Sequence, residues 1–375
     1  MANKFKKIIV EIARILLGCT FVFSGFVKAV DPLGGAYKFH DYFAAWGIDW
    51  LDFLSLPASF GLSALEFTLG ICLLLGVYRI IVSWFILAFM AFMTLLALYL
   101  AIYNPVTDCG CFGDALVITN WQTFYKNLIL IALAIIVFVW NKKITRFVPK
   151  KIQKWATTCI ILFILGVSYY CYTHLPILDF RPYKIGNNIR ELMEIPDDAE
   201  QDVYETALIY EKNGVQQKFS LTDYPKNDTA WKFVETINTL IKKGYEPPIH
   251  DFTITTENGD EITDVVLNDT SCTFLLIAHK LEKANDSHID KINNIYDWAN
   301  DNNYRFLCLT ASTADEIEAW RTSTGAEYPF CITDDVTLKT IIRSNPGLVL
   351  IKDAVVIDKW PNSCLPMEKE INSLK

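Results

Sequence analysis

The sequence predicts an α-helical membrane bundle, a four-helix core plus a fifth transmembrane helix, followed by an extracytoplasmic α/β domain. Hydrophobic residues make up 52% of the 375 residues and charged residues only 20%. Residues 1–175 carry 14 Lys and Arg against 8 Asp and Glu, whereas residues 176–375 carry 20 against 34. An apolar, slightly basic half joined to an acidic half indicates that one half lies in lipid and the other in water. The acidic half also argues against nucleic-acid partners.

Five apolar runs are long enough to cross a hydrocarbon core of about 30 Å, which takes about 20 residues of helix. These runs are residues 8–30, 58–78, 80–103, 121–140 and 155–172. The first run carries Glu11 and Arg14, exceeds an ordinary signal-peptide core in length and lacks a small-x-small cleavage pattern. We therefore expect it to be a membrane span and not a cleaved signal peptide.

The positions of the basic residues predict the orientation of the spans. Lysine and arginine gather before the first span, between the second and third, and between the fourth and fifth. Short loops rich in Lys and Arg stay in the cytoplasm. The loops at residues 31–57 and 104–120, and the whole acidic half, then lie on the other face. We predict a multi-pass protein of the bacterial inner (cytoplasmic) membrane with a cytoplasmic N-terminus and a periplasmic C-terminal domain.

The chain divides into four predicted segments. They are a four-helix membrane bundle (1–140), a basic cytoplasmic turn with the fifth transmembrane helix (141–175), an α+β linker subdomain (176–246) and an α/β domain (247–375). In the linker subdomain, strands 203–210 and 215–221 flank a turn that contains Asn-Gly and predict a hairpin. Apolar residues at helical spacing predict a helix over 229–243. After a Pro-Pro pair, a strand is expected at 251–256, and strands then alternate with helices, which favours an α/β layer.

Two of the ten cysteines stand apart because they lie on a polar loop on the predicted outer face. Cys109 and Cys111 are separated only by Gly110, and a disulfide needs a Cα separation of roughly 4.4–6.8 Å. Gly110 relaxes the backbone of so small a ring. A strained, exposed disulfide has a high reduction potential and suits electron exchange with substrate thiols. Asp108 and Asp114 argue the other way, because carboxylates disfavour a nearby thiolate unless a cation offsets them.

The residues alone leave three interpretations of this pair open: a redox dithiol, an inert structural disulfide, or two metal ligands. A metal site needs three or four convergent ligands. His40 and His174 are the histidines of the membrane half, and no such set is visible in the sequence. We therefore predict no metal.

The membrane half resembles a known family over about its first 140 residues, the extent of a four-span unit. The resemblance rests on the tract Ser24-Gly25-Phe26-Val27-Lys28-Ala29-Val30-Asp31-Pro32, on Glu66, and on the loop Asp108-Cys109-Gly110-Cys111-Phe112-Gly113. These features are similar to the DoxX-like family, in particular its methylamine-utilisation MauE-like branch. The resemblance implies a four-helix bundle and a role in disulfide formation or electron exchange with a membrane quinone during maturation of exported proteins. Cys109 and Cys111 match the branch's cysteine positions, and Lys28 and Glu66 match its intramembrane polar positions.

Charged residues inside the spans predict a polar pocket beneath the two cysteines. Such residues are costly in hydrocarbon and face a bundle interior or a cavity, usually with a partner. Lys28 lies near the outer end of its span, and at 1.5 Å per residue Glu66 and Lys126 lie about 12 Å and about 8 Å below the outer ends of theirs, so we expect all three to meet under Cys109 and Cys111. The pocket would hold a quinone headgroup or relay the proton that accompanies thiol oxidation. A structural ion pair that sets helix packing is an equally weighted alternative.

The last segment resembles the thioredoxin-like superfamily. The resemblance rests on the α/β order and on Ser344-Asn345-Pro346-Gly347, which immediately precedes two strands. It implies that Pro346 is cis and that Asn345 and Pro346 contact an extended substrate chain. The family's Cys-x-x-Cys is missing, because the corresponding position reads Ala278-His279-Lys280-Leu281-Glu282-Lys283-Ala284. We therefore expect no dithiol chemistry in this domain.

These observations support two hypotheses of function. In the first, the protein is an integral membrane thiol–disulfide oxidoreductase or redox maturation factor. Cys109 and Cys111 would be the catalytic pair, a membrane quinone the candidate acceptor, and exported or envelope proteins the clients. In the second, it is a non-enzymatic membrane-anchored scaffold or binding protein with a structural Cys109–Cys111 disulfide.

Overall fold

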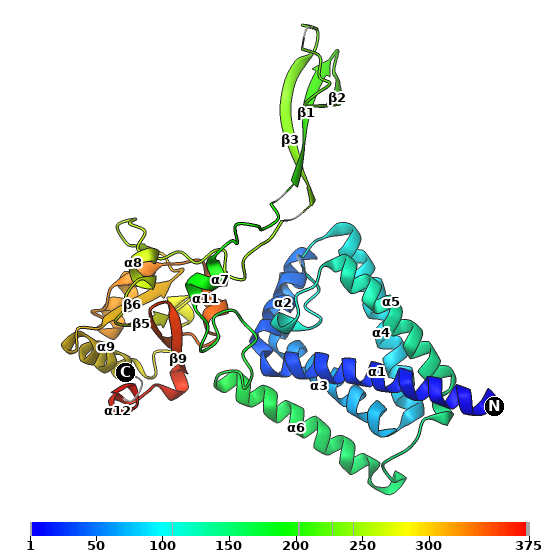
Figure 1. Ribbon diagram of the computed structural model, residues 1–375. Coiled ribbons are helices and arrows are strands. Elements are labelled where there is room, and N and C mark those ends of the chain that lie inside the picture. The colour runs from blue at the N-terminus through cyan, green and yellow to red at the C-terminus, as the bar shows by residue number, and fades with distance from the viewer. Residues whose placement is uncertain (1, 107, 202, 227, 243, 373–375) are drawn as a thin grey trace.

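The computed structural model describes residues 2–106, 108–201, 203–226, 228–242 and 244–372. Three residues at predicted boundaries lie outside the described residues: Met1 and Lys375, at the ends of the first and last predicted segments, and Lys243, the last residue of the predicted helix. The chain forms a helical bundle and an α/β domain, and a narrow three-stranded sheet projects away from both (Figure 1). The predicted fold class, a bundle of long apolar helices followed by an α/β domain, is confirmed.

Five helices in the described part of the chain are long and apolar enough to cross a membrane. They are α1 (Ala2–Val30), α3 (Ser55–Leu75), α4 (Arg79–Tyr103), α5 (Asn120–Val139) and α6 (Gln153–Thr173). Helix α3 ends at Gly76, which adopts the left-handed conformation common after a helix C-terminus. Helix α5 begins at a capping box in which Thr119 and Gln122 bond each other's backbone N–H groups. Helices α1 and α3 pack together, α4 packs on α5, and α6 lies against α1 and α3.

The basic turns gather at one end of the bundle, and the dithiol loop lies at the other. At one end the basic turns meet: Arg79 donates a hydrogen bond of 2.7 Å to the Lys142 carbonyl oxygen, and Lys143 bonds Asn3 near the N-terminus. The opposite end carries the loop between α4 and α5, the end of α6 and a short helix that the sequence analysis treated as loop. This helix, α2 (Pro32–Ala45), begins because the Asp31 side chain accepts a hydrogen bond from the Gly34 N–H.

The α/β domain contains a six-stranded sheet with the order β4-β7-β6-β5-β8-β9. The strands are β4 (Thr255–Thr256), β5 (Cys272–Ile277), β6 (Arg305–Thr310), β7 (Phe330–Ile332), β8 (Gly347–Lys352) and β9 (Val355–Pro361). Strands β5, β6 and β7 run parallel, whereas β8 and β9 form an antiparallel hairpin on β5. A cis bond joins Asn345 to Pro346 directly before β8. This topology agrees with the predicted thioredoxin-like fold.

Helices and apolar clusters cover both faces of this sheet. The helices are α8 (Thr263–Leu267), α9 (Ile289–Asp301), α10 (Ala314–Thr324), α11 (Asp335–Ile341) and α12 (Glu368–Asn372). Ile292 of α9 and Ile317 of α10 belong to the cluster on one face, and Leu338 of α11 belongs to the other. The strands carry apolar side chains toward both clusters, as expected for a sheet covered on both sides.

The predicted linker segment 176–246 contributes to two parts of the structure. Tyr183 and Ile189, the latter in α7 (Ile189–Met193), are buried in the core of the α/β domain. Asn188 forms a β-bridge with Val355 at the end of the six-stranded sheet. The separate part begins later, at about the first strand of the projecting sheet, because the preceding segment has apolar side chains that the large domain can bury.

The projecting sheet has the order β2-β1-β3. Strands β1 (Val203–Lys212) and β2 (Val215–Ser220) form the predicted hairpin, which is confirmed. The predicted helix at 229–243 is wrong: this segment contains β3 (Lys232–Lys242), which pairs antiparallel with β1. Its many β-branched residues favour a strand, and pairing with β1 outweighs the helical spacing of its apolar residues. The strand predicted at 251–256 is reduced to β4.

Candidate functional site

Cys109 and Cys111, in the loop between α4 and α5, lie next to each other. The Sγ atoms of Cys109 and Cys111 are 3.1 Å apart, between α4 and α5. Gly110 makes this turn possible, because its φ of +66° is rarely adopted by residues with a side chain. Its N–H donates a hydrogen bond of 2.8 Å to the Asp108 carboxylate, which closes the turn. The sulfurs are therefore held where a small shift would join them in a disulfide.

The predicted intramembrane ion pair holds this loop in position through hydrogen bonds. Lys28 of α1 forms an ion pair of 2.9 Å with Glu66 of α3, and both side chains are almost fully buried. Lys28 Nζ also donates a hydrogen bond of 2.5 Å to the Cys111 carbonyl oxygen, which accepts a second one of 2.7 Å from Ser24. One buried ion pair thus balances its own charge and positions the backbone of Cys111.

Lys126 of α5 lies beside the same loop and contacts an aromatic ring there. Its Nζ lies 4.1 Å from the centre of the Phe112 ring. Lys126, Glu66 and Cys111 line a hollow of about 30 Å³. One water molecule needs about 10–15 Å³ of such volume, so the hollow has room for about two. A hollow of this size is smaller than a quinone headgroup, and the Lys28–Glu66 pair beside it fits both the predicted proton relay and the predicted structural ion pair.

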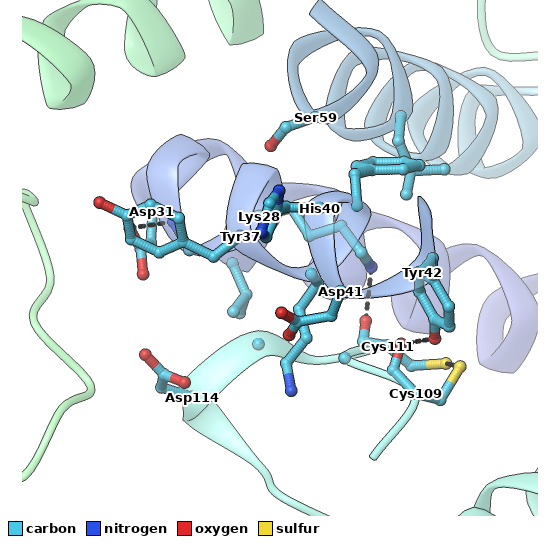
Figure 2. A pocket seen from close by; sticks show the side chains of 18 of the residues that line it. Lys28, Asp31, Tyr37, His40, Asp41, Tyr42, Ser59, Cys109, Cys111 and Asp114 are labelled. Carbon is cyan, nitrogen blue, oxygen red and sulfur yellow. Dashed lines mark hydrogen bonds between the residues drawn. The ribbon is translucent and has the colours of Figure 1, made fainter. Parts of the chain in front are cut away.

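A much larger cavity lies on the other side of the cysteines. It has a volume of about 480 Å³, within the range of small-molecule sites, and both cysteines line it. Figure 2 shows the two sulfur atoms at one wall with the Tyr42 hydroxyl beside them. Much of the apolar part of the wall comes from α2, the residue that follows it, and α4. It includes Phe39, Phe43, Trp46, Phe89, Phe92 and Met93.

The α/β domain covers the polar end of this cavity. Arg343, which follows α11, forms ion pairs of 2.6 Å with Asp31 and 3.1 Å with Asp114 of the membrane half. Its guanidinium also lies over the Tyr37 ring, 5.4 Å from the ring centre. Burial raises the pKa of Asp31, but the adjacent Arg343 outweighs this effect and lowers the pKa to about 2. The two halves therefore meet through ion pairs at the polar end of the cavity that the dithiol also lines.

The surroundings of the two thiols favour a thiolate at one of them. A hydrogen bond from Cys109, opposed by burial and helped by Lys126 and Lys28, lowers the pKa of Cys111 to about 6. The same hydrogen bond and burial raise the pKa of Cys109 above its usual value. The carboxylates that argued against a thiolate are both paired: Asp108 with Lys38 at 2.6 Å, and Asp114 with Arg343. Nearby cations thus offset them.

The predicted substrate-contacting residues are less accessible than expected. Pro346 is buried, and the Asn345 side chain donates a hydrogen bond of 2.9 Å to the Lys280 carbonyl oxygen within its own domain. In this structure, neither residue offers an open edge to a client chain. His40 pairs with Asp52 at 2.9 Å on the surface. Within the described ranges, no group of three or more His, Cys, Asp or Glu side chains could hold a metal ion.

Three residues that the sequence analysis did not single out contact this site. Tyr42 donates a hydrogen bond of 3.0 Å to the Cys109 carbonyl oxygen, and Lys38 pairs with Asp108. Residues 38 and 42 are spaced i,i+4, so prediction of α2 would have placed them on one helix face. Arg343 had no comparable signal, because its partner Asp31 is 312 residues away in the chain.

Two stretches of the chain match family models. Residues 6–140 match the family described as methylamine utilisation protein MauE. Residues 204–243, which include the projecting sheet, match a domain of unknown function, DUF8463. A search of curated proteins found no match.

Solved structures similar to the C-terminal part include a putative protein disulfide isomerase from Bacteroides thetaiotaomicron, with 19% identity and a TM-score of 0.27. A putative thioredoxin from Neisseria meningitidis has 14% identity and a TM-score of 0.28. StoA from Bacillus subtilis has 12% identity and a TM-score of 0.26. Each alignment covers 33% of this chain, and 80%, 87% and 94% of the respective neighbours. At this level the likeness carries no argument about function. The chain thus joins a MauE-like membrane segment, residues 6–140, to a domain that resembles thioredoxin-like folds.

Proposed function

We propose that this protein is an integral membrane thiol–disulfide oxidoreductase that matures exported proteins through Cys109 and Cys111. The observation that carries the proposal is the pair of sulfurs 3.1 Å apart at the wall of a cavity of about 480 Å³. The low pKa of Cys111, about 6, supports it, because a thiolate is both the better nucleophile and the better leaving group.

The orientation is part of the proposal. The basic turns meet at one end of the bundle, and Lys and Arg in short loops favour the cytoplasm. The dithiol loop belongs to the opposite end, which carries α2 and the end of α6. In the bacterial inner membrane this orientation puts Cys109, Cys111 and the α/β domain on the side of the oxidising periplasm, where disulfides form and persist.

The chemistry is thiol–disulfide exchange. A client thiolate attacks the Cys109 sulfur of the oxidised pair, the Cys109–Cys111 bond breaks, and Cys111 leaves as a thiolate. A second client thiolate then attacks the client sulfur of the mixed disulfide. The client disulfide forms, and Cys109 leaves as a thiolate that takes up a proton. The client has lost two electrons, and the dithiol has gained them.

A lipid-soluble acceptor, with a membrane quinone as the candidate, would reoxidise the dithiol by taking two electrons and two protons. The larger cavity suits such an acceptor, because Phe89, Phe92 and Met93 belong to a membrane span and both cysteines share its wall. The small hollow beside Glu66 has room for water and not for a ring, so it suits a water-mediated proton route: Cys109 gives up one proton on reoxidation, and water supplies the second proton that the acceptor takes.

The test of the function is thiol trapping in intact cells with and without quinone synthesis. We expect Cys109 and Cys111 to be mostly oxidised when quinone is present and to become reduced when it is depleted. Serine variants of either cysteine are the controls that assign the trapped thiol signal to Cys109 and Cys111. Oxidation that persists unchanged without quinone would support the alternative, a scaffold with a structural disulfide.

Replacement of Glu66 by Gln tests the proton route. The variant keeps the shape of the side chain but leaves Lys28 without a charged partner, so we expect reoxidation of the dithiol to slow by about tenfold or more. The measurement is the rate of disulfide return after reduction of the purified full-length protein with added quinone. Glu11→Gln is the matched control, because Glu11 pairs with Arg14 at 2.8 Å in the same bundle but far from the cysteines. Equal rates in both variants would contradict this route.

A further inference from the structure

Tyr42 is the one tyrosine whose hydroxyl the contacts of the described residues place on the dithiol loop, and its side chain is half-buried. It lies on α2, outside the membrane spans, and its ring stacks on Trp46 with 5.6 Å between ring centres. Its hydroxyl donates a hydrogen bond of 3.0 Å to the Cys109 carbonyl oxygen. Figure 2 shows this hydroxyl directed at the loop, next to the two sulfur atoms. The stacked ring fixes the hydroxyl while leaving it free to rotate about its C–O bond.

The electrostatic setting makes Tyr42 a donor and not a base. Burial, followed by the neighbouring Cys109, raises the pKa of Tyr42 far above its usual value, so the hydroxyl keeps its proton. Conversely, the neighbouring Tyr42 hydroxyl and the charge of Lys126 are the influences that lower the pKa of Cys109. Cys111 and burial act in the opposite direction. Tyr42 is therefore placed to favour the less stable of the two thiolates.

The exchange reaction requires that thiolate at one step. When the client disulfide forms, the bond between the client sulfur and Cys109 breaks, and the electron pair of that bond stays on Cys109. A leaving thiol of high pKa leaves slowly, and a charge-assisted hydrogen bond is roughly twice as strong as a neutral one. A donor that reaches the Cys109 sulfur at this moment accelerates the step that releases the client.

We propose that Tyr42 is a catalytic residue of this site, whose hydroxyl turns from the Cys109 carbonyl oxygen to the Cys109 sulfur and stabilises the departing thiolate. The inference rests on the proposed function for its meaning in catalysis. The hydrogen bond to the sulfur can be measured without any turnover. After the client leaves, Cys109 takes a proton from water, and Tyr42 returns to the carbonyl oxygen with its own proton retained.

The first experiment measures the hydrogen bond directly. In purified full-length Cys111→Ser protein, the rate of Cys109 alkylation by a small reagent is followed against pH, with and without Tyr42→Phe. We expect Tyr42→Phe to raise the midpoint by about one pH unit, which is about tenfold slower alkylation below the midpoint. Tyr37→Phe is the matched control: it is also on α2 and lines the same cavity, but it contacts Arg343 and not the cysteines. A residue that only supports the loop would leave the midpoint unchanged.

The second experiment follows the catalytic step with a synthetic peptide that contains two thiols. In otherwise wild-type protein, we expect Tyr42→Phe to slow the decay of the mixed disulfide by about tenfold while its formation changes by less than about twofold. An unchanged alkylation midpoint overturns the role of Tyr42, whether or not the cysteines turn over. A shifted midpoint in a protein whose cysteines never respond to quinone confirms the hydrogen bond and instead contradicts the proposed function.

Discussion

Two groups of cysteines in this protein are both shielded from water, yet they are chemically opposite. In the loop between α4 and α5, a hydrogen bond from Cys109 and the nearby Lys126 and Lys28 lower the pKa of Cys111 to about 6. In the α/β domain, burial among apolar side chains raises the pKa of Cys331 to about 11, and that of Cys308 well above its usual value. Burial alone makes a thiol inert, and only donors and cations brought to the sulfur make it reactive.

The membrane half and the α/β domain differ in the same way, because only the first carries thiols placed for reaction. The α/β domain has the topology of a thioredoxin-like fold, but the position after β5 carries His279 and no cysteine. Its most direct link to the dithiol is Arg343, which bonds Asp31 and Asp114. The membrane half supplies the thiols, and the α/β domain supplies a cover over the cavity that they line. Three predictions test this division.

The largest expected effect concerns thiol reactivity. After reduction, a small alkylating reagent at pH 7 should modify Cys111 at least about a hundredfold faster than Cys308 or Cys331, because only Cys111 is mainly a thiolate. Mass spectrometry of peptides from the full-length protein after timed quenching gives the rates. The exposed Cys364 is the internal control for access without activation. Modification of Cys331 as rapid as that of Cys111 would remove the contrast.

The second prediction concerns the cover. Arg343→Gln leaves the Asp31 carboxylate buried without its cation and removes the pull on Asp114, so the two halves should separate more often. We expect a bulky maleimide to react with Cys109 and Cys111 about tenfold faster. Coupling between two connected sites commonly changes an equilibrium by about this factor. A small maleimide should react at a nearly unchanged rate. Arg321→Gln, which breaks an ion pair with Glu257 inside the α/β domain, is the control and should have no such effect.

The smallest effect is a pH dependence of stability in the α/β domain. Burial, followed by Lys339, lowers the pKa of His279 to about 4 from 6.5. The folded state therefore binds fewer protons than the unfolded state, and stability is full above pH 6.5 and falls as the pH approaches 4. His279→Asn should flatten this fall by at most about 2 kcal/mol, allowing for partial exposure. Chemical denaturation in detergent at pH 4.5 and 7 measures it, and the exposed His40→Asn serves as the comparison. An equal slope in both variants would refute the assignment.

Much of the architecture could be predicted from local sequence. A helix in lipid must be about 20 apolar residues long, so five spans were visible from composition alone. The α/β order of the C-terminal domain was visible from alternating patterns. Helix α2 and strand β3 could not be predicted from local sequence, each for its own reason. The polar outer face of α2 hides its periodicity, and the choice between helix and strand at 232–242 depends on pairing with β1.

The sequence by itself determined which atoms are available for chemistry at this site: two thiols joined through Gly110, and charged side chains placed in apolar spans where only a partner makes them tolerable. Tertiary structure alone decided how reactive those atoms are. The electrostatic influence of a charge falls off within a few ångströms, and Lys28, Tyr42, Lys126 and Arg343 reach the loop from four separate helices or their ends. Chain folding, and not local pattern, sets those distances.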